Sequence, residues 1–133
     1  MNNKKLILKM INKNYIYAII GASNNEEKYG NKILKDLLNK KFNLIPINPK
    51  EKEILGLKCY ATLSEYYKEN KLIDVVIFVV PPNITEKKLF EVKKLNINKV
   101  WMQPGSESEK AINFCKENNI EIIYNSCIMV KTN

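Results

Sequence analysis

The stretch YIYAIIGAS, residues 15–23, joins a short apolar strand directly to a glycine turn, which is typical of an α/β fold. Its first six residues are rich in aromatic and β-branched side chains, which favours a buried parallel strand that stops at Gly21. Further along, Ile33 and Leu37 belong to an apolar set at helical spacing, which predicts a helix over about Tyr29 to Lys40. This strand, turn and helix predict the first half of a βαβ unit.

The rest of the chain continues this alternation of strands and helices. Further strands are predicted at 42–47, 73–80, 99–102 and 120–124, and further helices at 64–71, after Thr85, and from Ser106 to Asn118. Ser64, Thr85 and Ser106 are the predicted N-cap residues of those helices. Such alternation implies right-handed crossovers. We expect an α/β fold, a three-layer Rossmann-like domain with a five-stranded parallel sheet and helices on both faces.

The length of 133 residues suits one domain. Residues 1–14 are predicted to form a leading amphipathic helix, and residues 15–130 the domain. The longest apolar run, Val75–Val80, stops at Pro81 and is far shorter than the roughly 20 residues of a membrane helix. We expect a cytoplasmic protein without membrane contact, although the basic, acid-free leading segment leaves organelle targeting open.

The formal net charge is +8, and Lys supplies all of the positive side chains because Arg and His are absent. Lys neutralises phosphates but lacks the planar fork with which Arg reads guanine, so no specific nucleic-acid partner is expected. The absence of His excludes mechanisms that rest on a Ser–His or Cys–His pair. The three cysteines, Cys59, Cys115 and Cys127, are widely spaced and odd in number, which indicates neither a disulfide framework nor a metal site.

Ligands of an open parallel sheet bind beyond the carboxyl ends of its strands. Four segments are expected at that edge: 21–30, 48–50, 81–84 and 103–106. The turn Gly21–Ser23 leads into a helix, whose N–H groups and dipole favour an anion such as a pyrophosphate. The alternative is a turn that needs glycine only for its own geometry, since the three-glycine fingerprint and the Walker lysine pattern are both absent.

The residues after the second predicted strand narrow the choice of ligand. NAD-type sites usually carry an acidic residue there, whereas this chain has Asn48, Pro49 and Lys50. A basic residue favours a ribose phosphate, which coenzyme A (CoA) carries at its 3′ position and NADP at its 2′ position. Lys28, in the first loop, is a second candidate for a phosphate contact, with a solvated surface role as its alternative.

Several segments occur together in a specific order: Ile20–Ser23, Lys28, Pro46–Pro49, Ile54–Gly56, Val80–Pro82, Trp101–Ser106 and Cys127. With these segments the chain resembles the stand-alone CoA-binding domain family, which is related to the N-terminal domain of the succinyl-CoA synthetase α subunit. The resemblance implies that the first loop holds the CoA diphosphate, that the basic residue after the second strand lies near the phosphorylated ribose, and that the later loops flank the ligand. Lys28 stands where relatives often carry Arg, which implies a weaker, monodentate contact.

Coenzyme A is therefore the predicted cofactor, and neither a metal ligand nor a catalytic residue is predicted. The predicted cofactor-binding residues are Gly21, Ala22, Ser23, Lys28, Asn48, Pro49, Lys50, Val80, Pro81, Pro82, Met102, Gln103, Pro104 and Gly105.

The expected function is binding of CoA or an acyl-CoA through the glycine loop, without catalytic activity of the chain itself. An acyl-CoA enzyme in another chain is an expected partner, and a homodimer is a common outcome for a small domain. Two alternatives stay open: an NADP-dependent or CoA-thioester enzyme, and a nucleotide-responsive redox regulator. Cys127 follows the last predicted strand, and is either a small buried residue or a thiol that forms a mixed disulfide with oxidised CoA.

Overall fold

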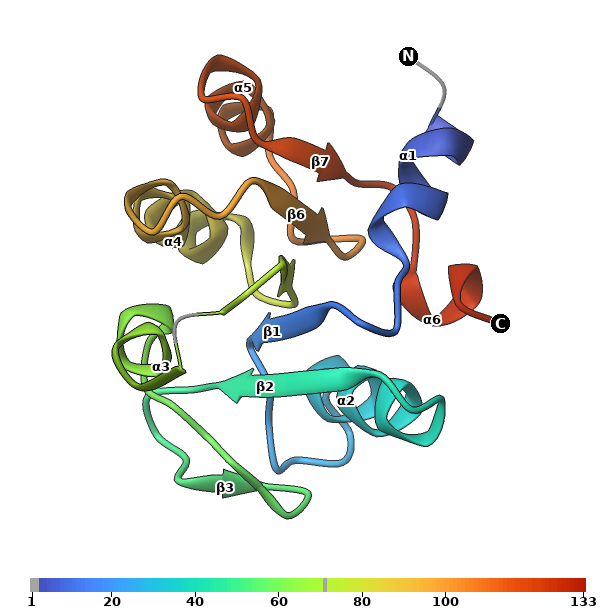
Figure 1. Ribbon diagram of the computed structural model, residues 1–133, viewed down its shortest axis with the longest axis vertical. Helices are drawn as coiled ribbons and strands as arrows, with labels where there is room; N and C mark the ends of the chain where they lie inside the picture. Colours follow the sequence, from blue (N-terminus) through green and yellow to red (C-terminus); the bar gives the residue numbers. More distant parts are fainter. Residues whose placement is uncertain (1–2, 71) are drawn as a thin grey trace.

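The computed structural model describes residues 3–70 and 72–133, and shows a five-stranded parallel sheet between two layers of helices (Figure 1). The elements in chain order are α1 (Asn3–Met10), β1 (Ile16–Ile20), α2 (Tyr29–Asn39), β2 (Asn43–Ile47), β3 (Glu53–Ile54), β4 (Leu57–Lys58), α3 (Leu63–Asn70), β5 (Val75–Phe78), α4 (Pro82–Lys94), β6 (Lys99–Met102), α5 (Glu109–Glu117), β7 (Glu121–Ile123) and α6 (Ile128–Lys131). The predicted α/β class and sheet are confirmed. Residues 1 and 2 of the predicted leading helix, and Lys71 at the predicted end of a later one, lie outside the described residues.

The order of the main sheet is β2-β1-β5-β6-β7, and every pairing in it is parallel. Ile20 at the end of β1 lies opposite Ile47 of β2 on one side and Phe78 of β5 on the other. The chain therefore adds β2 on one side of β1, and then adds β5, β6 and β7 in turn on the other side. The carboxyl ends of β1 and β5 form the switch point at which such sheets bind ligands.

Side chains of the inner strands alternate between two buried clusters, as the two-residue period of a strand requires. Tyr17 and Ile19 of β1 join the cluster that α1, α2 and α6 cover, whereas Ala18 and Ile20 join the cluster that α3, α4 and α5 cover. Figure 1 shows these two groups of helices on opposite sides of the sheet. All four residues of β5 are buried, which confirms the prediction that this apolar strand is central and covered on both faces.

Two predicted N-caps are wrong, because Ser106 has another hydrogen-bond partner and Thr85 lies inside a helix that begins earlier. Helix α5 begins after Ser108, whose hydroxyl accepts a hydrogen bond from Ala111 N at 3.0 Å. Ser106 instead accepts from Val80 N at 3.1 Å and ties the β6–α5 loop to the end of β5. Thr85 is fully buried inside α4, which begins at Pro82. Proline suits that position because its fixed φ is helical and its missing N–H would have no intrahelical partner.

The third predicted N-cap, Ser64, is also wrong. Helix α3 begins at Leu63, and Thr62 Oγ1 accepts from Glu65 N at 3.1 Å. Ser64 instead donates its hydroxyl to Glu91 Oε2 of α4 at 2.6 Å. A side-chain partner on another helix therefore decides how this serine is used.

The sequence did not predict the hairpin of β3 and β4 or the helix α6. The two central residues of the hairpin, Leu55 and Gly56, both have positive φ values, 49° and 79°, as in a type I′ turn. Strands of two residues and a helix of four are too short to show a period in the sequence. Within the part of the chain that the structure describes, no helix is long and apolar enough to cross a membrane.

Helix α1 packs on the sheet through its apolar side. Met10 is fully buried beside Tyr17, whose hydroxyl donates to Met10 O at 2.6 Å and accepts from Asn12 N at 2.9 Å. Leu8 lies on the opposite side of the helix and is 67% exposed. The amphipathic pattern of the leading segment therefore has a physical basis in this packing.

We expect Met10→Ala to lower the free energy of unfolding by about 2–5 kcal/mol, since it removes a fully buried side chain. Leu8→Ala on the same helix is the matched control, with an expected change within about 0.5 kcal/mol. Urea denaturation followed by circular dichroism measures both. Equal effects of the two substitutions would show that α1 does not pack as described.

Candidate functional site

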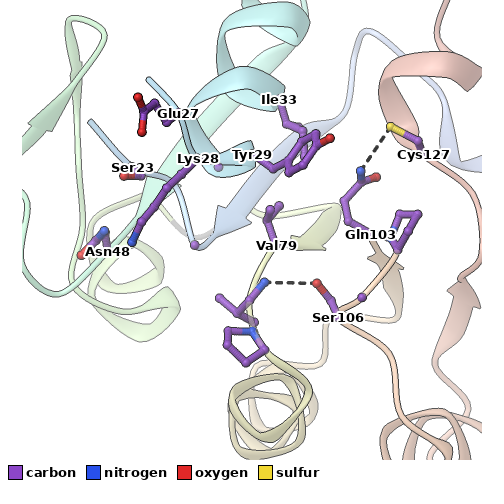
Figure 2. Close-up of a pocket in the computed structure, with 16 residues that line it drawn as sticks. Ser23, Glu27, Lys28, Tyr29, Ile33, Asn48, Val79, Gln103, Ser106 and Cys127 are labelled. Atoms are coloured by element: carbon purple, nitrogen blue, oxygen red, sulfur yellow. Dashed lines mark hydrogen bonds between the residues drawn. The ribbon is translucent and has the colours of Figure 1, made fainter. Parts of the chain in front are cut away.

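A cleft of about 860 Å³ lies at the carboxyl edge of the sheet, at the switch point between β1 and β5 (Figure 2). Its volume is within the range of about 300–1,000 Å³ that is typical of small-molecule sites. The residues that line it are Gly21, Ser23, Glu27, Lys28, Tyr29, Gly30, Ile33, Asn48, Val79, Val80, Pro81, Gln103, Pro104, Gly105, Ser106 and Cys127. They come from five separate segments, which only the folded sheet brings together.

Most of the residues predicted to bind the cofactor line this cleft. These are Gly21, Ser23, Lys28, Asn48, Val80, Pro81, Gln103, Pro104 and Gly105. The structure therefore brings the first loop, the end of β2 and the two later loops to one place.

Five predicted residues lie outside the lining. Ala22 and Met102 are fully buried in the two clusters on opposite faces of the sheet. Pro82 is the first residue of α4. Pro49 and Lys50 are exposed just beyond Asn48, and Lys50 N donates to Asn48 Oδ1 at 2.8 Å. The backbone of Lys50 is thus bonded to Asn48, which lines the cleft, but the Lys50 side chain is not part of the lining.

The glycine turn is shaped by contacts between backbones. Gly21 has a φ of 101°, and a Cβ atom there would collide with Val79 O at the end of β5. A Cβ atom on Gly30, in the first turn of α2, would collide with Gly21 O. Both glycines are therefore required by the packing of β1, α2 and β5, whether or not a ligand is bound. The alternative stated for this turn, that it needs glycine for its own geometry, has direct structural support.

Side-chain amides fix the loop that this packing creates. Asn31 of α2 is 4% exposed and donates from Nδ2 to Ser23 O at 3.0 Å. Asn48, at the end of β2, donates to Ala22 O at 2.8 Å. Asn24 donates to Glu53 O at 2.9 Å and also contacts the Glu51 carboxylate. The loop is consequently tied to α2, β2 and β3. Sequence reasoning missed Asn31, although a polar residue on an otherwise apolar helix face is a usable signal.

Helix α2 presents its N-terminus to the cleft. Its N-cap residue, Lys28, makes no side-chain cap hydrogen bond, whereas the N-cap residue of α5, Ser108, accepts one from Ala111 N. An uncapped helix start leaves N–H groups and the positive end of the dipole available for an anion. Lys28 adds a positive side chain to the lining and Glu27 a negative one. This end of the cleft is accordingly polar.

The other end of the cleft is mainly apolar. Tyr29 and Ile33 of α2 line it together with Cys127. Figure 2 shows Tyr29 and Ile33 on the side of Gln103 and Cys127, and Ser23, Lys28 and Asn48 on the other side. The residues of the lining that the predicted set lacked are Glu27, Tyr29, Gly30, Ile33, Val79, Ser106 and Cys127. The apolar ones were indistinguishable in the sequence from ordinary core positions.

The family model of the CoA binding domain matches residues 16–133. The chain belongs to the CoA binding domain family. This confirms the resemblance that the ordered segments indicated. Among the relatives, the ADP-forming acetate–CoA ligase of Methanocaldococcus jannaschii is 34% identical over 129 residues, and the match covers 91% of this chain but 18% of the ligase. The chain therefore spans less than a fifth of that relative.

Solved structures of similar proteins share the fold. A conserved hypothetical protein from Pyrococcus furiosus is 44% identical, with a TM-score of 0.82 over 88% of this chain and 98% of that one. A protein from Pyrococcus horikoshii OT3 is 28% identical, with a TM-score of 0.84 over 98% of this chain and 89% of that one. In both comparisons the shared fold covers most of each chain.

We expect Gly30→Ala to lower the free energy of unfolding by about 1–3 kcal/mol, because the added methyl collides with Gly21 O. Helix propensity alone would give the opposite sign, since Ala is favoured over Gly by about 1 kcal/mol. Lys35→Ala, at an exposed position of the same helix, is the control and should change stability by less than about 0.5 kcal/mol. A Gly30→Ala protein more stable than wild type in urea would contradict the backbone contact.

Proposed function

We propose that this chain binds coenzyme A, or an acyl-CoA, with the diphosphate at the first turn of α2 and the pantetheine arm along the apolar part of the cleft. The observation that carries the proposal is the uncapped N-terminus of α2, which opens on the cleft at the switch point of the sheet. Membership of the CoA binding domain family supports the choice of ligand.

The two ends of the cleft suit the two ends of this ligand. A diphosphate needs N–H donors and positive charge, which the first turn of α2 and Lys28 supply. Ser23 Oγ accepts from Asn25 N at 3.0 Å, so its hydroxyl proton remains able to donate to a phosphate oxygen. A pantetheine arm is long, thin and only sparsely polar. The mainly apolar side chains of Tyr29, Ile33 and Val79 in the lining suit such an arm. Polar and apolar parts of ligand and cleft thus correspond.

Lys50 is proposed to meet the 3′-phosphate of the ribose. Its backbone is fixed by the hydrogen bond to Asn48, and its exposed side chain leaves from the edge of the cleft that carries the glycine loop. The net charge of +8 further favours the encounter with a polyanion such as CoA.

We propose that the chain does not catalyse a reaction itself. The titratable side chains among the described residues of the lining are Glu27, Lys28, Tyr29 and Cys127. Cys127 Sγ has the amide of Gln103 as its hydrogen-bond partner, and an amide cannot serve as the base that activates a thiol. Binding of CoA for an enzyme on another chain is the role that fits these groups.

Calorimetric titration with CoA, dephospho-CoA, NADP and NAD tests the proposal. We expect CoA to bind about tenfold more tightly than dephospho-CoA, as one charge-assisted hydrogen bond would give. Lys50→Ala should remove most of this difference, while Lys52→Ala, which deletes the same charge two residues away, should preserve it. Binding of NADP without binding of CoA would overturn the proposed ligand, and an unchanged preference in Lys50→Ala would overturn the role of Lys50.

A further inference from the structure

Cys127 is held in place by hydrogen bonds on both sides of it. The residue before it, Ser126, accepts from Trp101 Nε1 at 2.9 Å, and the residue after it donates its N–H to Gln103 Oε1 at 2.8 Å. Trp101 is fully buried and Gln103 is 5% exposed, so both anchors are parts of the core. The sulfur between them is therefore fixed at the wall of the cleft and does not belong to a free loop.

The amide of Gln103 is directed at the same place. Because Ile128 N occupies Oε1, the amide is oriented with Nε2 toward the cleft, where it donates to Cys127 Sγ at 3.4 Å (Figure 2). The Nε2 group has two N–H bonds, and within the described residues Sγ is its one hydrogen-bond acceptor. A nearly buried amide thus keeps one donor for a group that enters the apolar end of the cleft beside the sulfur.

The other two cysteines have different surroundings. Cys115 is fully buried on the α3–α5 side of the sheet, and burial raises the pKa of its thiol to about 12. Cys59 is 7% exposed, its Sγ lies 3.6 Å from Asn48 O, and burial raises the pKa of its thiol as well. Since the thiolate is the reactive form, both are poor nucleophiles. Cys127 is partly exposed and is the cysteine that lines the cleft.

We propose that Cys127 is a thiol-exchange site at which CoA disulfide transfers one CoA unit to the protein. The proposal rests on the proposed function, because the disulfide must enter the same cleft. Diphosphate and thiol lie at opposite ends of the pantetheine arm, just as Ser23 and Lys28 lie on one side of the cleft in Figure 2 and Cys127 on the other. Binding of the nucleotide end would raise the local concentration of the disulfide at Cys127.

The exchange is balanced without another reactant. The Cys127 thiolate, whose proton goes to water, attacks one sulfur of CoA disulfide, and the bond between the two CoA sulfurs breaks as the bond to Cys127 forms. The second CoA leaves as a thiolate and takes up a proton. The protein thiol is oxidised while the disulfide is reduced to one free CoA. A reducing thiol reverses the step, so occupancy of the cleft becomes dependent on redox conditions.

Intact mass spectrometry of the full chain tests this site, with CoA disulfide and pantethine, the disulfide that lacks the nucleotide, as probes. We expect one CoA unit per chain in the wild type and in Cys59→Ser, and none in Cys127→Ser. Peptide mapping of the wild type should place the adduct on Cys127, which locates it even if a variant folds poorly. At low micromolar concentrations, CoA disulfide should react at least about tenfold faster than pantethine.

An adduct on Cys59 or Cys115 would overturn the proposal. Equal rates with the two disulfides would also overturn it, because Cys127 would then be only an accessible thiol. Calorimetry of the wild type with reduced CoA, in the presence of a phosphine reductant, separates this inference from the proposed function. Binding of reduced CoA without any adduct from CoA disulfide refutes the exchange alone, whereas absence of both refutes the binding site itself.

Discussion

The contact between Gly30 and the carbonyl of Gly21 sets the position of everything at the ligand edge. No side chain with a Cβ atom fits at either glycine, because each faces backbone atoms of a neighbouring element. Helix α2 can therefore start directly above the end of β1, and the end of β5 lies against the same turn. The start of a helix, the end of the sheet and the point of reversed strand order then coincide. A cleft with a helix N-terminus at its edge follows from that coincidence.

The loops around this turn owe their positions to polar groups that connect separate strands. Asn48 joins the end of β2 to the glycine loop, and Ser106 joins the β6–α5 loop to the end of β5. Trp101 and Gln103 do the same for the segment that carries Cys127. Each connection leads from a buried strand to one wall of the cleft. The wall is consequently held by bonds to the core. This favours selective binding, because a ligand then loses little affinity to the ordering of loops and side chains.

The sequence was sufficient to predict the strands and their covering helices, because apolar runs such as that of β5 and the periodic face of α2 are local signals. It also placed most of the candidate site at one edge, since parallel strands share their carboxyl ends. What it missed depends on partners far away in the chain. In the sequence, Ser106 and Ser108 are equally suitable N-cap residues. Only in the folded chain does Val80 N donate to Ser106, which leaves Ser108 to cap α5. Met102 directly precedes Gln103 of the site, but the alternation of side chains along β6 directs the Met102 side chain into the core.

The proposed position of CoA is the carboxyl edge of the sheet, around the first turn of α2. Titration of the isotope-labelled protein with CoA, followed by amide chemical shifts, tests this position residue by residue. The largest changes should fall on the amides of Gly21, Ser23, Gly30, Gln103 and Gly105, which line the cleft. Changes concentrated instead in the groove between α1 and β7, around Leu6 and Ile122, would contradict this position, because that groove lies away from the switch point.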